Sequence, residues 1–446
     1  MTHNNRILDF IRETQWEDLP EAVQHQSKRC LLDTLGALIA GHNTPVGRLM
    51  EKLALAQFPG DQARILVSGQ KASAAGATLA NGFAGNALDI DDGYRPTMGH
   101  PGACVLPPLL TAGQFMGNGT MGREVRPTDL LTALVMGYET GTRAGLVRHA
   151  TYETYHSSGS WGAIAGTAAA GKLMGLSRDH LRHALGAAEY HAPIAPMMKC
   201  IEVPGMGKDS IGWGCMVAML SVLMAKEGFT GINPIFDDSP EPSWIESIGS
   251  EWEIFKLYFK PYSACRWAQP GVDGVLKLVG ENGLTPGDIR KIEVFTFKES
   301  AALSTAYPEN TEEAQYNIAF PIAAALLDGE VGPGQILPPR LFDADIRAMM
   351  DKIRITAQER FQVNFPARAE SEVELTTFTG QTFNSGIMSA RWDTHSALPT
   401  DAELSDKFTW LAGPVLGTDK ARALTTLVMG LEREKSLDQF FELCIK

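Results

Sequence analysis

The sequence predicts a mainly α-helical protein that contains a smaller α+β insert. Apolar residues at helical spacing fill about the first 260 of the 446 residues, and alternating patterns typical of strands follow. Helical patterns return at Thr400, which forms a capping-box pattern with Glu403. We therefore expect a helical domain built from residues 1–268 and 399–446, interrupted by an α+β domain at residues 269–398.

The helical part shows separate patterns for successive helices. Residues 20–39 place apolar side chains on one stripe, and Pro127 is typical of a first helical position. Ser177 is a candidate N-cap for the helix that follows it. Small residues let helices approach closely, so we expect three segments rich in glycine and alanine at the centre of this domain: 72–87, 159–171 and 212–225.

The insert mixes strand and helix patterns. Residues 291–297 alternate apolar and polar side chains, as a half-buried strand does. Residues 372–377 and 381–384 flank Thr379-Gly380, which is typical of a hairpin turn. Between these strands, we expect a helix over residues 312–328.

Composition and charge limit the classes of partner. The net charge of -13 argues against a nucleic-acid or an anionic-membrane partner. No uncharged apolar run reaches the roughly 18 residues that a membrane span needs. The polar N-terminus does not resemble a signal peptide, and the six cysteines form no C-x-x-C pair. We expect a cytoplasmic protein with reduced thiols.

An acidic, glycine-rich segment between two predicted helices is the first candidate site. It contains Asp89, Asp91 and Asp92, and His100 follows eight residues after the last of them. A carboxylate beside an imidazole can transfer protons near neutral pH, because the carboxylate orients the ring and tunes its pKa. The same aspartates can instead cap a helix or a turn.

Two further glycine-bounded segments each carry one candidate residue. His156 precedes a Gly/Ala-rich helix, where ring donors and free backbone N–H groups can bind an anion, although a capping or core histidine fits the same pattern. Lys208 also precedes an apolar helix, where its ammonium can hold a carboxylate. The alternative for Lys208 is a solvated surface lysine.

A last candidate, Arg266, lies at the predicted domain junction, where it can bind a carboxylate or hold the two domains together. For cofactors and metals we expect none. Gly117–Gly122 fits G-x-G-x-x-G but follows a helix instead of a strand, and no H-E-x-x-H motif occurs. The aspartates at 89–92 are the one candidate for a hard-cation site.

Several segments, taken in their order and spacing, resemble the MmgE/PrpD family, whose members include 2-methylcitrate dehydratase, cis-aconitate decarboxylase and iminodisuccinate epimerase. The resemblance covers essentially the whole chain and rests on ALDIDDGYRPTMGHPGACVLP, YHSSGSWGAIAGTAAAGKLMGLS, GMGKDSIGWG, KPYSACRW and AQYNIAFPIAAALLDG. It implies a large helical domain with a smaller α+β domain, a homodimer, and chemistry on small di- or tricarboxylates without metal or organic cofactor.

The resemblance also implies a set of site residues. The acid/base and substrate-binding positions carried over from the family are Asp89, His100, His156 and Lys208. Asp92 is the alternative to Asp89, and Arg266 and Tyr316 are further substrate-binding candidates. The chain differs from the decarboxylase at Phe320, where a tyrosine is expected, and from several relatives at Gln269, where they have a histidine.

We therefore expect a lyase that removes water from, or adds it to, a citrate-like carboxylate such as 2-methylcitrate. Abstraction of a proton next to a carboxylate needs a base, an acid and cations that stabilise the intermediate. The alternatives are a cis-aconitate-type decarboxylase, a dicarboxylate epimerase or isomerase, and a carboxylate-binding family member without catalysis. In each case we expect one pocket lined by His100, His156 and Lys208.

Overall fold

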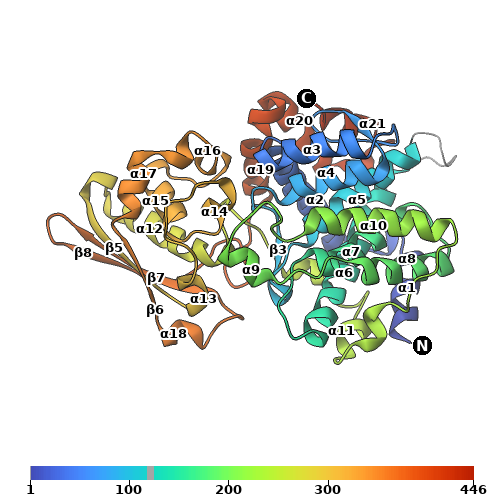
Figure 1. The fold of residues 1–446 in the computed structure, drawn as a ribbon, viewed down its shortest axis with the longest axis horizontal. Coiled ribbons are helices and arrows are strands. Elements are labelled where there is room, and N and C mark those ends of the chain that lie inside the picture. The colour runs from blue at the N-terminus through green and yellow to red at the C-terminus, as the bar shows by residue number, and fades with distance from the viewer. Residues whose placement is uncertain (1, 118–124) are drawn as a thin grey trace.

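The computed structural model describes residues 2–117 and 125–446, and it confirms a mainly α-helical fold with an α+β part (Figure 1). Most of the G-x-G-x-x-G segment at 117–122 lies outside the described residues. In Figure 1 the helices of the N-terminal half gather on one side, the four-stranded sheet lies at the far end of the other side, and the C-terminal helices return to the first group.

The helical part contains long helices from both ends of the chain. Its helices are α1 (His3–Glu13), α2 (Glu21–Gly41), α3 (Pro45–Gln57), α4 (Ala74–Asn86), α5 (Pro101–Phe115), α6 (Pro127–Thr151), α7 (Gly159–Leu173), α8 (Arg178–His191), α9 (Met197–Glu202), α10 (Ile211–Lys226), α11 (Ser243–Glu246), α19 (Asp401–Leu416), α20 (Thr418–Met429) and α21 (Asp438–Leu443). The C-terminal α19 packs against α2, which brings the two ends of the chain into one layer.

The α+β part is built on one mixed sheet with strand order β6-β5-β7-β8. Its strands are β5 (Ile289–Thr296), β6 (Ile353–Ala357), β7 (Glu370–Thr377) and β8 (Thr382–Ser389). β5 runs parallel to β6 and antiparallel to β7, and β7 and β8 form the predicted hairpin. Helices of this part are α12 (Gln269–Asn282), α13 (Lys298–Ala301), α14 (Thr311–Gln315), α15 (Ala319–Asp328), α16 (Pro333–Ile336), α17 (Ala344–Met350) and α18 (Glu359–Gln362).

Local signals in the sequence account for several boundaries. The Ser177 side chain accepts a hydrogen bond from the backbone of His180 at the start of α8. Thr400 and Glu403 form the predicted capping box at the start of α19. Gly380 has φ +87° in the β7–β8 turn, a conformation that costs a glycine little.

The Gly/Ala-rich segments form α4, α7 and α10, and α7 packs against α5, α6 and α10. The close approach leaves no room for larger residues. A Cβ atom at Gly141 in α6 would lie 2.3 Å from the Cβ of Ala165, and one at Gly162 would lie 2.2 Å from the sulfur of Cys104. The prediction of a central, tightly packed set of helices is confirmed.

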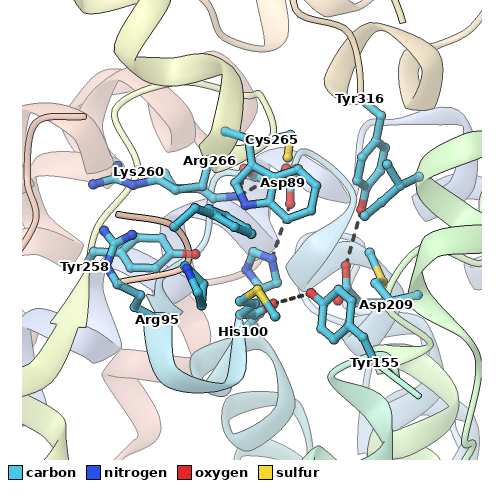
Figure 2. Close-up of a pocket in the computed structure, with 16 residues that line it drawn as sticks. Asp89, Arg95, His100, Tyr155, Asp209, Tyr258, Lys260, Cys265, Arg266 and Tyr316 are labelled. Carbon is cyan, nitrogen blue, oxygen red and sulfur yellow. Dashed lines mark hydrogen bonds and ion pairs between the residues drawn. The ribbon is translucent and has the colours of Figure 1, made fainter. Parts of the chain in front are cut away.

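The single helix expected at 312–328 is wrong, because the structure divides it into α14 and α15. The Asn317 side chain accepts a hydrogen bond from the backbone of Phe320 and so begins a new helix. The break at residues 316–318 matters for the site, because Tyr316 projects from it toward the helical part (Figure 2).

Two large hydrophobic cores correspond to the two parts. One unites residues of α1, α2, α4–α8 and α10 with residues of α19–α21, and the other fills the space around the sheet and α12, α15 and α17. The division at residues 268 and 398 stays a prediction. Within the described residues, no helix is both long and apolar enough to cross a membrane.

A short strand pair joins the loop after α4 to the end of the helical half. β3 (Gly93–Tyr94) pairs antiparallel with β4 (Leu257–Tyr258), and Gly93 faces Tyr258. A Cβ at Gly93 would lie 2.1 Å from the Tyr258 ring, so only glycine allows this contact. The pairing holds the predicted acidic segment beside residues 258–266.

Candidate active site

The cavity next to this strand pair lies between the helical part and the α+β part, and Figure 2 shows the side chains around it. Its lining residues come from the loop after α4, the segment after α6, α9 and the loop that follows it, β4 and the segment after it, and the α+β part: Asp89, Arg95, Met98, His100, Tyr155, Met197, Ile201, Asp209, Tyr258, Lys260, Cys265, Arg266, Trp267, Tyr316, Phe365 and Pro366.

Asp89 forms a buried ion pair with Lys260. The Lys260 ammonium lies 3.0 Å from Asp89 Oδ2 and also donates to the Asp89 carbonyl oxygen at 3.0 Å. Asp89 has φ +52°, so the two bonds hold a backbone conformation that a non-glycine residue seldom adopts. Burial disfavours the charged lysine, but Asp89, together with Tyr258, Asp91 and Cys265, outweighs burial and raises the pKa of Lys260.

His100 lies between two carboxylates. Its Nε2 is 3.4 Å from Asp89 Oδ1, its Nδ1 is 3.1 Å from Asp91 Oδ2, and Nδ1 also lies 2.9 Å from the Asp92 carbonyl oxygen. Burial opposes the charged imidazolium, but the Asp91 carboxylate outweighs it and raises the pKa of His100 to about 9. The ring is therefore charged at neutral pH, and Nε2 carries a proton toward Asp89 and the cavity.

Lys208 supports this array from behind the cavity instead of lining it. Its ammonium donates to the Asn86 carbonyl oxygen at 2.5 Å and to Gln315 Oε1 at 2.6 Å. The Asn86 side chain in turn donates to Asp91 at 3.0 Å. Burial raises the pKa of Asp91. The positive charges of His100 and, more weakly, of Lys260 and Lys208 outweigh burial and hold that pKa below its usual value.

Tyr316 and Asp209 form the opposite wall of the cavity. The Tyr316 hydroxyl donates to Asp209 Oδ2 at 3.3 Å, and Ser158 donates to the other Asp209 oxygen at 2.9 Å. Ser158 also accepts from the backbone N–H of His100 at 3.1 Å. Figure 2 shows Tyr155 on the same side, with its hydroxyl directed toward the loop that carries His100.

His156 lies next to the cavity-lining Tyr155 but does not line the cavity itself. Its ring stacks on His149 with centroids 4.4 Å apart, and its Nδ1 lies 2.6 Å from the Ser160 hydroxyl. Burial lowers the pKa of His156, and the nearby Arg148 lowers it further. The structure thus separates His156 and Lys208 from the pocket that was predicted to unite them with His100.

Asp92 faces the helical core and not the cavity. It accepts from the backbone of Gly102 at 2.8 Å and from the Tyr138 hydroxyl at 2.6 Å, so it anchors the first turn of α5. Burial and the neighbouring Asp33 raise the pKa of Asp92 to about 7. Of the two alternatives for the substrate-facing carboxylate, the geometry favours Asp89.

Arg266 lines the cavity while its two terminal nitrogens are fully engaged. They donate to Gln269, to Asp393, and to the carbonyl oxygens of Phe259, Ala390 and Arg391. These bonds tie the segment after β4 to the segment before α19, which is the linking role considered for it. Phe320 and Gln269, the two family differences, are fully buried outside the cavity lining.

Cationic side chains outnumber anionic ones at the cavity surface, while Asp91 and Asp393 behind it pair with His100 and with the two arginines. Among its lining residues, Arg95, His100, Lys260 and Arg266 are cationic, and Asp89 and Asp209 are anionic. Such a site attracts anions. Asp89, Asp91 and His100 can bring ligand atoms within 4.8 Å of one another, but the Lys260 ammonium beside Asp89 disfavours a divalent cation there.

Sequence reasoning did not identify four residues of this site: Lys260, Asp209, Tyr258 and Arg95. Lys260 was visible as the first residue of the Lys260–Arg266 segment, and Asp209 directly follows Lys208. Tyr258 and Arg95 carried no signal, because their position depends on the two-residue pairing of β3 with β4.

Comparison with known proteins gives the family. The MmgE/PrpD N-terminal domain matches residues 5–245, and the MmgE/PrpD C-terminal domain matches residues 262–433. Similar curated proteins include a cis-aconitate decarboxylase of Aspergillus terreus, 22% identical over 98% of this chain and 95% of the relative. The human cis-aconitate decarboxylase is 27% identical over 93% of this chain and 88% of the relative. The chain belongs to the MmgE/PrpD family.

Proposed function

We propose that this chain is a lyase that acts on a citrate-like carboxylate by proton transfer at a carbon atom next to a carboxylate group. The observation that supports the proposal most strongly is the buried pairing around His100. A charged imidazole presents Nε2 to the cavity 3.4 Å from Asp89, whose other oxygen is held by Lys260. An acid, a carboxylate base and a cation are thereby placed together.

The roles follow from charge and position. The His100 imidazolium supplies a proton, and Asp89 is the carboxylate that can accept one at the cavity surface. The Lys260 ammonium favours negative charge that grows on a substrate carboxylate during the reaction. Tyr316 can donate its hydroxyl proton in a hydrogen bond to the substrate in place of Asp209, 3.3 Å away.

Dehydration of a citrate-like substrate is the first candidate reaction. Asp89 removes the proton next to a carboxylate, the C–O bond to the neighbouring hydroxyl breaks, and His100 gives its proton to the departing hydroxide to form water. Decarboxylation of a cis-aconitate-like substrate is the second candidate. There, the C–C bond to a carboxylate breaks, carbon dioxide leaves, and the acid protonates the carbon atom.

One observation favours the second candidate, and another removes an objection to it. Relatives that match over most of this chain include two named cis-aconitate decarboxylase and one named cis-aconitate decarboxylase-like protein. In addition, Phe320 and Gln269, the positions that differ from the decarboxylase or from other relatives, are buried away from the cavity, while Tyr316 supplies a hydroxyl at its wall. Those two differences therefore do not argue against decarboxylation.

Proton NMR in deuterated buffer separates these reactions. We expect incubation with citrate, 2-methylcitrate or cis-aconitate to give either the signals of a dehydrated acid or those of a decarboxylated one with deuterium at carbon. His100→Asn should abolish turnover, while His25→Asn, a surface histidine paired with Asp401, should retain it. Absence of both product and deuterium exchange with every acid would contradict the proposal.

Substitution of Lys260 should mainly lower kcat/KM, and substitution of Lys208 should mainly lower the free energy of unfolding. Lys260→Met removes the cation beside Asp89 at the cavity, so we expect kcat/KM to fall about a hundredfold or more. Lys208→Met leaves the Asn86 carbonyl and Gln315 without their partner, so we expect a loss of about 1–3 kcal/mol of unfolding free energy.

The comparison needs kinetics and urea unfolding on both variants. Lys260→Met should show by far the greater loss of kcat/KM, although it also loses stability because Asp89 is left buried without its ion-pair partner. If Lys208→Met kept full stability and lost activity more than Lys260→Met, then Lys208 and not Lys260 would be the functional cation.

We also propose a homodimer formed through the helical part. Large apolar side chains are exposed along residues 190–213, with Tyr190 72%, Val203 78% and Trp213 46% exposed. Apolar exposure concentrated in this way is typical of an interaction surface. Light scattering should give twice the 48.4 kDa of one chain. Val203→Asp should shift the mass toward one chain and Phe378→Asp should not, whereas a single-chain mass for the unchanged protein would refute the dimer.

A further inference from the structure

The side of the cavity that carries Tyr258 and Arg95 is not used by the proposed proton transfer. Figure 2 shows these two residues on one side of His100, with Tyr155, Asp209 and Tyr316 on the other. The proposed chemistry engages His100, Asp89, Lys260 and Tyr316 and leaves the Tyr258 side unassigned.

Tyr258 is buried and its hydroxyl has no hydrogen-bond partner among the residues that the structure describes, although its side chain lines the cavity. Its ring is fixed from two directions. Gly93 allows the ring to pack against the backbone of β3, and the Arg266 guanidinium lies over the ring with Cζ 4.5 Å from the centroid. A fixed, buried donor that points at a cavity is matched to an acceptor on a ligand.

Arg95 supplies a second donor beside this ring. Its Cζ lies 5.8 Å from the Tyr258 centroid, and its Nη2 donates to Asp393 Oδ2. The same Asp393 oxygen accepts from Arg266 at 2.8 Å, so one carboxylate serves two guanidinium groups. The Nε atoms of Arg95 and Arg266 are buried without a hydrogen-bond partner among the described residues.

This arrangement has more cationic donors than acceptors. Two guanidinium groups share the Asp393 carboxylate, their two Nε–H groups have no partner among the described residues, and the Tyr258 side chain lies beside them at the cavity. A planar anion with two oxygens is a better partner for such buried donors than water is. The anion carries the opposite charge, and its two oxygens fit the spacing of the donors.

We propose that Arg95 and Tyr258 form a subsite for a second substrate carboxylate, one that does not take part in the bond breaking at His100. Arg266 is a positioning residue that holds the Tyr258 ring, and Asp393 is the internal counter-ion of the pair. The inference rests on the proposed function, because it assumes that the reacting carboxylate lies near His100 and Lys260. The subsite selects acids with at least two carboxylates over monocarboxylates.

Binding of unreactive acids tests the subsite without turnover. Glutarate and its monoamide have the same length and differ by one carboxylate, so the ratio of their dissociation constants reports recognition of the second carboxylate. By calorimetry, we expect the unchanged protein to bind glutarate at least tenfold more tightly than the monoamide. Tyr258→Phe and Arg95→Lys should each reduce that ratio to about threefold or less.

A matched control lies on the surface of the α+β part. Tyr307 also stacks with an arginine, Arg347, with Cζ 5.3 Å from its ring centroid, but it is exposed and outside the cavity. Tyr307→Phe should leave the ratio unchanged. Tyr258→Phe removes one oxygen atom from a packed ring, so its thermal unfolding should confirm that the fold is retained.

The outcomes separate the two proposals. A ratio that stays at the unchanged protein's value in both Tyr258→Phe and Arg95→Lys overturns the subsite, even if turnover is observed. A ratio that falls as expected in a protein that transforms none of the acids supports the subsite and contradicts the lyase.

Discussion

The buried contacts of His100 with Asp89 and Asp91, completed by Lys260, are the constraint on which the site depends. Removing a charged group from water costs on the order of several kcal/mol, and pairing offsets that cost only when every partner is present. His100 pairs with both aspartates and Lys260 pairs with Asp89. The Lys208 ammonium, which lies behind the cavity, also stabilises the Asp91 carboxylate. Each carboxylate therefore needs the cation beside it. As a result, the cavity contains a charged acid, His100, next to a carboxylate, Asp89.

The fold creates this array by closing one loop onto a distant segment. Asp89 lies in a left-handed conformation after α4, and Lys260 holds both its carbonyl and its carboxylate. The two-residue pairing of β3 with β4 brings Lys260 to that loop, and Gly93 permits the approach of Tyr258. Tyr316 reaches the same cavity from the α+β part because the helical conformation is interrupted between α14 and α15. The site thus depends on contacts between three separate regions.

Much of the fold could be predicted from the sequence, because helical spacing, caps and alternating strands are local signals. Asp89, His100, Arg266 and Tyr316 were predicted site residues that do line the cavity. Lys208 and His156 were expected to line the cavity with His100 and do not, because a sequence does not show which way a side chain near a helix start points. The Lys208 ammonium donates hydrogen bonds to Asn86 and Gln315, and the His156 ring stacks on His149. Tyr258 and Arg95 depend on a strand pair too short to produce a pattern.

The chemistry of the site depends on the charge state of His100. Its pKa of about 9 lies above the ordinary 6.5, so the stability contributed by the charged ring is fully present below about pH 6.5 and is lost as pH rises through about 9. Nitrogen-15 NMR of the labelled histidines measures this directly. We predict that the His100 ring is doubly protonated at pH 7.5, titrates near pH 9, and titrates at a lower pH in Asp91→Asn. A His100 ring that is neutral at pH 7.5 in the unchanged protein would contradict this prediction.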